Sequence, residues 1–131
     1  MVEKSAVLMV GWHPNAVDYS KWPGLTPDKL WAGFEADRVR LEALGYDAEL
    51  GLIESADTAD STLRKLLAAK PRQCVLVGAG VRTIPDYLHL FEKLVNTVHA
   101  CAPHAKICFN SGPFDSVDAI QRWVGPTTHT P

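Results

Sequence analysis

Polar or aromatic side chains that could bind a ligand follow three apolar segments of the chain, each time beside glycine. Glycine lets the backbone approach a bound molecule closely, and a neighbouring polar group can then form a hydrogen bond with it. The alternative is that these glycines only turn the chain from a strand into a helix. We predict that the ligand-binding residues are Gly11, Trp12, Gly78, Gly80, Arg82, Asn110 and Ser111.

Two of the side chains in these segments have distinctive chemistry. His13 could act as an acid or base near neutral pH and is the predicted catalytic residue, with a surface or capping role as the alternative. Arg82 stands near a predicted helix start, where free N–H groups and the helix dipole favour an anion. Its guanidinium would add a planar, bidentate donor. A small ligand carrying phosphate or carboxylate is therefore predicted, the alternative being a surface ion pair of Arg82 with Asp86 or Asp115.

Strands and helices that alternate along the chain must position these residues. Continuous or alternating apolar patterns predict strands over residues 6–11, 47–53, 74–78 and 105–110. Capping signals and helical spacing predict four helices between them. The helices are expected from Thr26 to Gly45, from Asp57 or Asp60 to Lys70, from Pro85 to Val98, and from Asp115 or Ser116 to Gly125.

This alternation predicts a three-layer α/β/α sandwich with a four-stranded parallel sheet. The first and third strands are wholly apolar and should be central, whereas the second carries Asp47 and Glu49 and should be an edge. The expected order is 2-1-3-4, a flavodoxin-like or Rossmann-like topology. Ligands of such sheets bind beyond the carboxyl ends of the strands where the order reverses, here between the first and third strands.

The connection from Gly11 to Thr26 is unusually long, at sixteen residues where about 2–6 are usual. It contains Trp12 and Trp22, and two tryptophans argue against disorder because they need a surface on which to pack. The connection is therefore either a lid over the ligand site or a packing element at the edge of the core.

The motifs of known families match this chain poorly. Gly78-Ala79-Gly80 resembles the start of a dinucleotide fingerprint, but Thr83 stands in place of the third glycine. The predicted topology is similar to that of response-regulator receivers, but their acidic positions hold His13 and Gly78-Ala79-Gly80. The sequence does not identify a cofactor. The alternative function is therefore a non-catalytic, receiver-like interaction module or a homodimerising domain.

Composition narrows the class of protein. The 131 residues suit one domain, expected over residues 1–125, with a tail at 126–131. A net charge of −2 gives no basic excess for binding nucleic acid or an anionic membrane, and the longest apolar run is far shorter than a membrane span.

Cys74, Cys101 and Cys108 form no C-x-x-C pair and are expected to be buried free thiols in a reducing cytoplasm. The histidines lack metal-ligand spacing, so no metal site is expected.

Overall fold

The structure is a computed structural model that describes residues 2–112 and 115–129. Its main sheet has four strands in the order β3-β2-β4-β5, and all neighbouring strands are parallel. A separate antiparallel ribbon joins β1 to β6. The strands are β1 (Val2–Lys4), β2 (Ala6–Trp12), β3 (Asp47–Ile53), β4 (Cys74–Val77), β5 (Lys106–Phe109) and β6 (Thr127–His129).

The parallel α/β sheet predicted from the sequence is confirmed. Its order reads 3-2-4-5 by strand number and not 2-1-3-4, because the unpredicted strand β1 precedes the four predicted segments in the chain. The two wholly apolar segments, β2 and β4, are neighbours at the centre, and β3 is an edge strand. Part of the expected tail, Thr127–His129, forms β6, while Thr130 and Pro131 lie outside the described residues.

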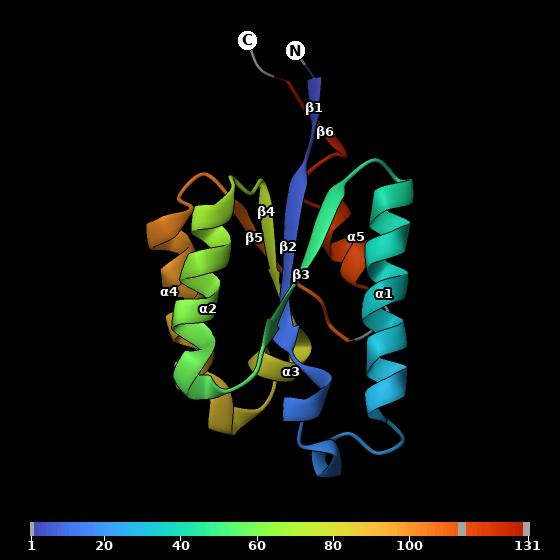
Figure 1. Cartoon of the computed structure of the whole chain (residues 1–131), viewed down its shortest axis with the longest axis vertical. Coiled ribbons are helices and arrows are strands. Elements are labelled where there is room, and N and C mark those ends of the chain that lie inside the picture. Colours follow the sequence, from blue (N-terminus) through green and yellow to red (C-terminus); the bar gives the residue numbers. More distant parts are fainter. Residues whose placement is uncertain (1, 113–114, 130–131) are drawn as a thin grey trace.

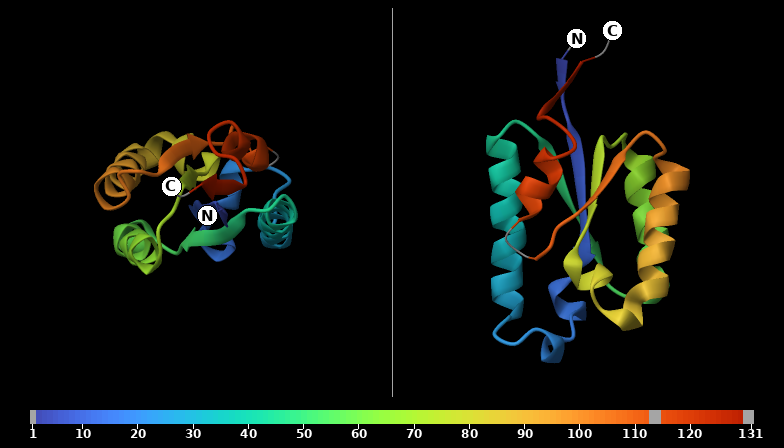
Figure 2. Two further views of the ribbon diagram at one scale, coloured as in Figure 1. Left: turned by 90° about the horizontal axis from the view of Figure 1, so that it is seen from above. Right: turned by 180° about the vertical axis from the view of Figure 1, so that it is seen from behind.

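Helices cover both faces of the sheet, as Figures 1 and 2 show. Helices α2 and α4 lie on one face, and α1 and α5 lie on the other. Within the described residues, no helix has the length and apolarity that crossing a membrane requires. The helices are α1 (Pro27–Ala43), α2 (Ala56–Ala69), α3 (Ala79–Arg82), α4 (Leu88–Cys101) and α5 (Ser116–Gln121), with 3-10 turns η1 (Pro14–Ala16), η2 (Tyr19–Lys21) and η3 (Pro85–Tyr87).

The ends of α1 follow their capping signals, but other helix ends differ from the prediction. Helix α4 begins at Leu88, after η3, and not at Pro85, and α5 ends at Gln121 and not at Gly125. Thr26 accepts a hydrogen bond from the Lys29 amide at the start of α1, and Gly45 follows that helix with a φ of 101°. The prediction that Asp57 or Asp60 caps α2 was wrong, because the Ser55 hydroxyl accepts the hydrogen bond from the Thr58 amide. A serine oxygen is as good an N-cap acceptor as an aspartate oxygen, so either signal was consistent with a helix here.

Two apolar clusters hold the layers together, one on each face of the sheet. On β2, Leu8 and Val10 face the α2 and α4 side, whereas Val7 and Met9 face the α1 and α5 side. Burial on both faces explains why this strand is continuously apolar. Cys74 and Cys108 are buried in the second cluster, as expected, but Cys101 at the end of α4 is exposed.

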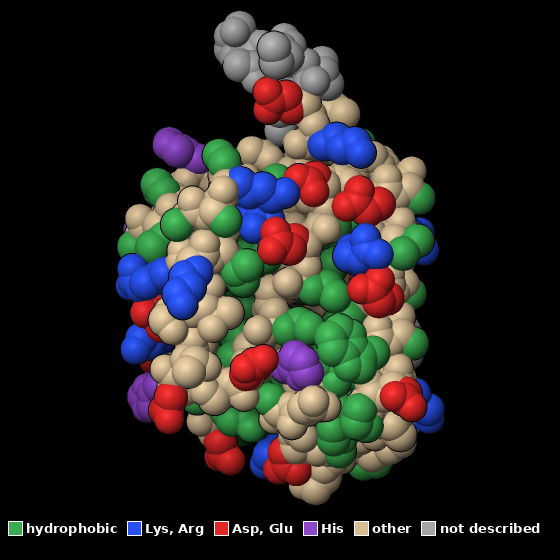
Figure 3. Space-filling view, in the orientation of Figure 1, with side chains coloured by type: hydrophobic (Ala, Val, Ile, Leu, Met, Phe, Trp, Pro, Cys, Tyr) green, Lys and Arg blue, Asp and Glu red, His purple; other side chains and the backbone are tan. Residues whose placement is uncertain are grey.

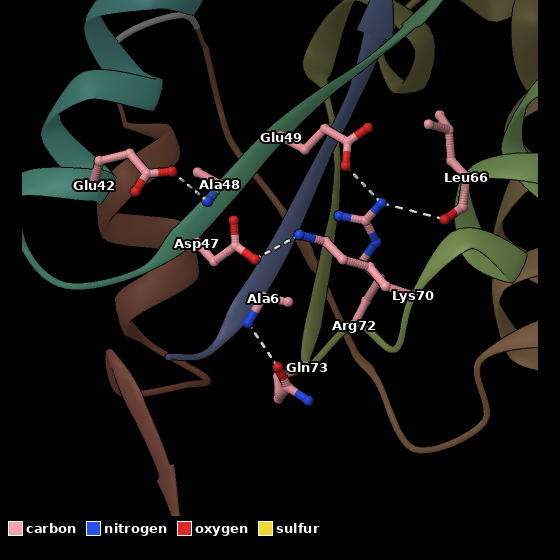
Figure 4. A network of polar contacts seen from close by, with 9 residues as sticks. All are labelled: Ala6, Glu42, Asp47, Ala48, Glu49, Leu66, Lys70, Arg72 and Gln73. Atoms are coloured by element: carbon pink, nitrogen blue, oxygen red, sulfur yellow. Dashed lines mark hydrogen bonds and ion pairs between the residues drawn. The ribbon is translucent and has the colours of Figure 1, made fainter. Parts of the chain in front are cut away.

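A polar network fastens the edge strand β3 near its amino end (Figure 4). Asp47 pairs with Lys70, and Glu49 accepts a hydrogen bond from Arg72 at 2.8 Å. The Arg72 side chain is fully buried and also donates to the Leu66 carbonyl at 3.2 Å. The network therefore ties the segment that follows α2 to the edge of the sheet, leaving the opposite end of the strands free for a site.

Candidate functional site

A cavity of about 120 Å³ lies between the first half of α1 and the carboxyl ends of the central strands. Most of its walls are apolar or aromatic. The lining residues are Met9, Val10, Gly11 and Trp12 of β2; Val17, Trp22 and Leu25 of the long connection; Leu30, Phe34 and Asp37 of α1; and Leu76, Gly78, Ala79, Gly80, Asn110, Gly112 and Ser116. This is the position at which a ligand site was expected, between β2 and β4.

The structure brings together five of the predicted site residues. Gly11, Trp12, Gly78, Gly80 and Asn110 all line the cavity. The cavity is narrow beside Gly11, where a Cβ would already be in van der Waals contact with the Phe34 ring at 3.6 Å. His13, Arg82 and Ser111 are not among the lining residues.

Arg82 is bound to neighbouring protein groups instead of facing the cavity. Its Nη2 donates a hydrogen bond to the Asn110 carbonyl, and its guanidinium carbon lies 5.8 Å from the centre of the Phe109 ring. Its Nε is buried and has no partner among the described residues. Arg82 thus joins the end of α3 to the end of β5.

His13 and Ser111 have local structural roles. The Nδ1 of His13 accepts a hydrogen bond from the Asn15 amide at 3.1 Å, which caps η1, and the imidazole meets the Trp31 ring edge-on at 5.3 Å. His13 lines a different, more open hollow with Asn15, Ala16 and Glu54. At this end of the molecule, Figure 3 shows a histidine beside a group of hydrophobic side chains. Ser111 donates to the Asp115 carboxylate, and this hydrogen bond helps to lower the pKa of Asp115.

The long connection forms one wall of the cavity. Val17, Trp22 and Leu25 come from it and line the space. Trp12, at the start of the connection, packs against Tyr87 with the two ring centres 5.1 Å apart, and it donates its indole N–H to the Gly80 carbonyl at 3.2 Å. Both tryptophans therefore line the cavity, and Trp12 is also buried in the core.

Asp37 is the site residue that the sequence reasoning missed. It is half-buried, lines the cavity, and lies in one helical stripe with Leu30, Phe34 and Leu41. The spacing of this stripe, with intervals of four, three and four residues, is that of an inward helix face. A carboxylate in the middle of such a stripe is unusual, and that break in the pattern was the signal available in the sequence.

A chain of hydrogen bonds leads to Asp37 through the wall of the cavity. The Ala79 amide donates to Asn110 Oδ1 at 2.8 Å, and Asn110 Nδ2 donates to the Ser116 hydroxyl oxygen at 2.9 Å. The Ser116 hydroxyl lies close enough to the Asp37 carboxylate to lower its pKa by hydrogen bonding. Asn110 and Ser116 are both buried, so the chain fixes the polar part of the wall.

Partial burial raises the pKa of Asp37 above its ordinary value, and the nearby charge of Asp115 acts in the same direction. The hydrogen bond from Ser116 and the charge of Arg40 oppose this shift. A cleft carboxyl with a raised pKa can exchange protons or bind a hydrogen-bond donor. The described residues contain no group of three or more His, Cys, Asp or Glu side chains arranged to hold a metal ion.

Comparisons of this chain with protein-family models, with curated proteins and with solved structures found no match.

Proposed function

We propose that this protein binds a small molecule in the cavity at the carboxyl ends of β2 and β4. The observation that carries the proposal is the cavity itself, which combines apolar and aromatic walls with a few convergent polar groups. That combination is the usual composition of small-molecule sites. The cavity lies between the two central strands, where ligands of doubly wound sheets bind, and this position supports our proposal that the fold is flavodoxin-like.

The geometry favours a mostly apolar ligand over the anionic one predicted from the sequence. Asp37 is the only charged side chain among the described residues that line the cavity, and it is acidic. Arg82, the expected anion ligand, is engaged with Asn110 and Phe109. A phosphate or carboxylate ligand stays a prediction, as does catalysis by His13.

An NMR titration of the ¹⁵N-labelled protein with benzyl alcohol, a neutral single-ring probe, tests the proposal. We expect saturable shifts of the Gly11, Gly78 and Gly80 amides, because these residues line the cavity. Gly11→Val should abolish the shifts, since its added methyl groups extend from a Cβ that already faces Phe34 at 3.6 Å. Gly33→Val is the matched control, because among the described residues no atom beyond its chain neighbours and its own helix backbone lies within 4 Å of a Cβ at that position.

The proposal is overturned if none of three ring compounds, benzyl alcohol, benzylamine or benzoate, gives saturable shifts at these glycines. It is also overturned if Gly11→Val binds the probe as well as Gly33→Val does. A far-ultraviolet circular dichroism spectrum of each variant shows that the fold is retained.

The second candidate function is homodimerisation, and one observation favours it. Trp31 and Val39 of α1 are 38% and 55% exposed, and Trp123, just after α5, is 56% exposed. Helices α1 and α5 cover the same face of the sheet, so these side chains belong to one layer. Sedimentation velocity over a range of concentrations tests this candidate: a monomer at all concentrations would refute it.

A further inference from the structure

We propose that the cavity selects a compact amine: a single ring, or an equally small apolar body, whose protonated amino group donates to the Asp37 carboxylate. This inference rests on the proposed function, because it names the class of ligand for the same site. It also reverses the sign of charge that the sequence predicted for the ligand.

The charge of the wall supports a cationic ligand. Asp37 is the sole charged lining residue in the described part of the chain. The cations nearby are engaged elsewhere: Arg38 pairs with Glu35 at 2.9 Å, and Arg82 donates to the Asn110 carbonyl. Two charges among the described residues act on Asp37 from outside the cavity lining, the cation Arg40 on the same helix and the anion Asp115, and they act in opposite directions. An amine entering the cavity would therefore meet a carboxylate and no competing cation on the wall.

The direction of the hydrogen-bond chain supports a ligand that donates. The Ala79 amide donates to Asn110, and the Asn110 side-chain amide donates to the Ser116 oxygen. The Ser116 O–H is then left to donate to Asp37, in agreement with its lowering effect on the pKa of that carboxyl. An ionised carboxylate has about four lone-pair sites and no proton to donate. With Ser116 occupying one site, the remaining capacity of Asp37 is that of an acceptor, which an ammonium group can satisfy.

Aromatic side chains provide the second half of the recognition. Trp12, Trp22 and Phe34 line the same cavity. Phe34 precedes Asp37 by three residues on α1, so the ring and the carboxylate lie on the same helix face. Aromatic faces attract cations and pack against rings, which favours a ligand that carries both.

The volume limits the size of the ligand. An apolar protein cavity of about 150 Å³ holds one benzene molecule. The present cavity, at about 120 Å³ and partly open to solvent, suits one ring whose amino group reaches the wall or the mouth. The amine N–H groups that Asp37 does not accept can then remain in contact with water.

Isothermal titration calorimetry with benzylamine, benzyl alcohol and benzoate tests the inference, because the three probes share a ring and differ in charge. For the wild-type protein at pH 7 we expect benzylamine to bind about tenfold more tightly than benzyl alcohol, since a charged hydrogen bond is the stronger one. Benzoate should bind most weakly. Asp37→Asn should reduce benzylamine affinity to the level of benzyl alcohol and leave benzyl alcohol within about twofold.

Asp28→Asn is the matched control, because it removes one carboxylate from the same helix without touching the cavity lining. Retained benzyl alcohol binding shows that Asp37→Asn is folded, and the ranking of the three probes on the wild-type protein needs no variant at all. Benzoate binding as tightly as benzylamine, or benzylamine binding equally to Asp37→Asn and Asp28→Asn, overturns the inference while the proposed function stands. Failure of all three probes to bind overturns the proposed function as well.

Discussion

Replacing Arg82 by alanine separates a structural role for this side chain from the ligand-binding role that the sequence predicted. In the structure, Arg82 donates a hydrogen bond to the Asn110 carbonyl and lies over the Phe109 ring at 5.8 Å. We therefore expect Arg82→Ala to destabilise the fold and to leave ligand affinity in the cavity nearly unchanged, because Arg82 does not line it.

The contacts of Arg82 set the magnitude of this effect. A hydrogen bond from a charged group contributes about 1.5–3 kcal/mol, and a cation over an exposed ring contributes about 0.5–1 kcal/mol. Because Arg82 is only half-buried, we take the lower end of both ranges and expect a loss of about 2 kcal/mol. The variant should remain folded, since natural domains have about 5–15 kcal/mol of stability.

Urea unfolding followed by circular dichroism measures this loss. With a slope of about 2 kcal/mol per molar urea, a typical value, the midpoint should fall by about 1 M. Phe109→Leu alone and combined with Arg82→Ala completes a double-mutant cycle, in which we expect a coupling of about 0.5–1 kcal/mol. An unchanged midpoint for Arg82→Ala, together with lost benzoate binding, would refute this reasoning and restore the anion site predicted from the sequence.

Three further substitutions test the local arguments. Asp37→Asn should be more stable than the wild-type protein at pH 8 and should lose that advantage at acidic pH. The pKa of Asp37 is raised in the native state, so part of the wild-type stability is present at low pH and is lost as this carboxyl ionises. Urea unfolding midpoints measured across pH would show no such trend if Asp37 were fully hydrated. Gly45→Ala should cost about 1–2 kcal/mol in urea unfolding, because its φ is 101° and a Cβ would lie 3.4 Å from Pro126; a cost below about 0.5 kcal/mol would contradict that strain. Glu49→Gln should lower the midpoint of thermal unfolding more than Arg72→Met does, because Glu49→Gln leaves the fully buried Arg72 guanidinium without its counter-ion. A larger decrease for Arg72→Met would contradict this explanation.

The parts of the fold that sequence predicted well are those with a strong local pattern. The apolar runs of β2 and β4 are long enough to need burial on both faces, and this requirement placed them at the centre. The strand β1 was missed because three residues are too few to show a period. It exists because it pairs with β6, a contact between opposite ends of the chain that no local pattern encodes.

In the candidate site too, features with a local sequence pattern were predicted, and features that depend on contacts distant in the sequence were not. The glycines after β2 and β4 predicted the position of the cavity because topology alone brings the carboxyl ends of parallel strands together. The direction of Arg82 could not be predicted, since its partners, Phe109 and the Asn110 carbonyl, come from a neighbouring strand. Asp37 does not follow from the strand exits, because the cavity takes one wall from α1, a helix that covers the sheet.

The ribbon of β1 and β6 has a practical consequence for engineering. It holds Lys4 opposite Thr127, and the adjoining Ser5 amide donates to the Pro126 carbonyl at 2.8 Å, so the two ends of the described chain leave the domain side by side. Figure 1 shows this exit at the end of the molecule away from α3 and η1, where the cavity lies. A short linker between the ends would therefore permit circular permutation, with new termini in the exposed turn at residues 103–104 between α4 and β5. The same geometry would allow the domain to be inserted into a surface loop of a reporter protein with its cavity facing outward.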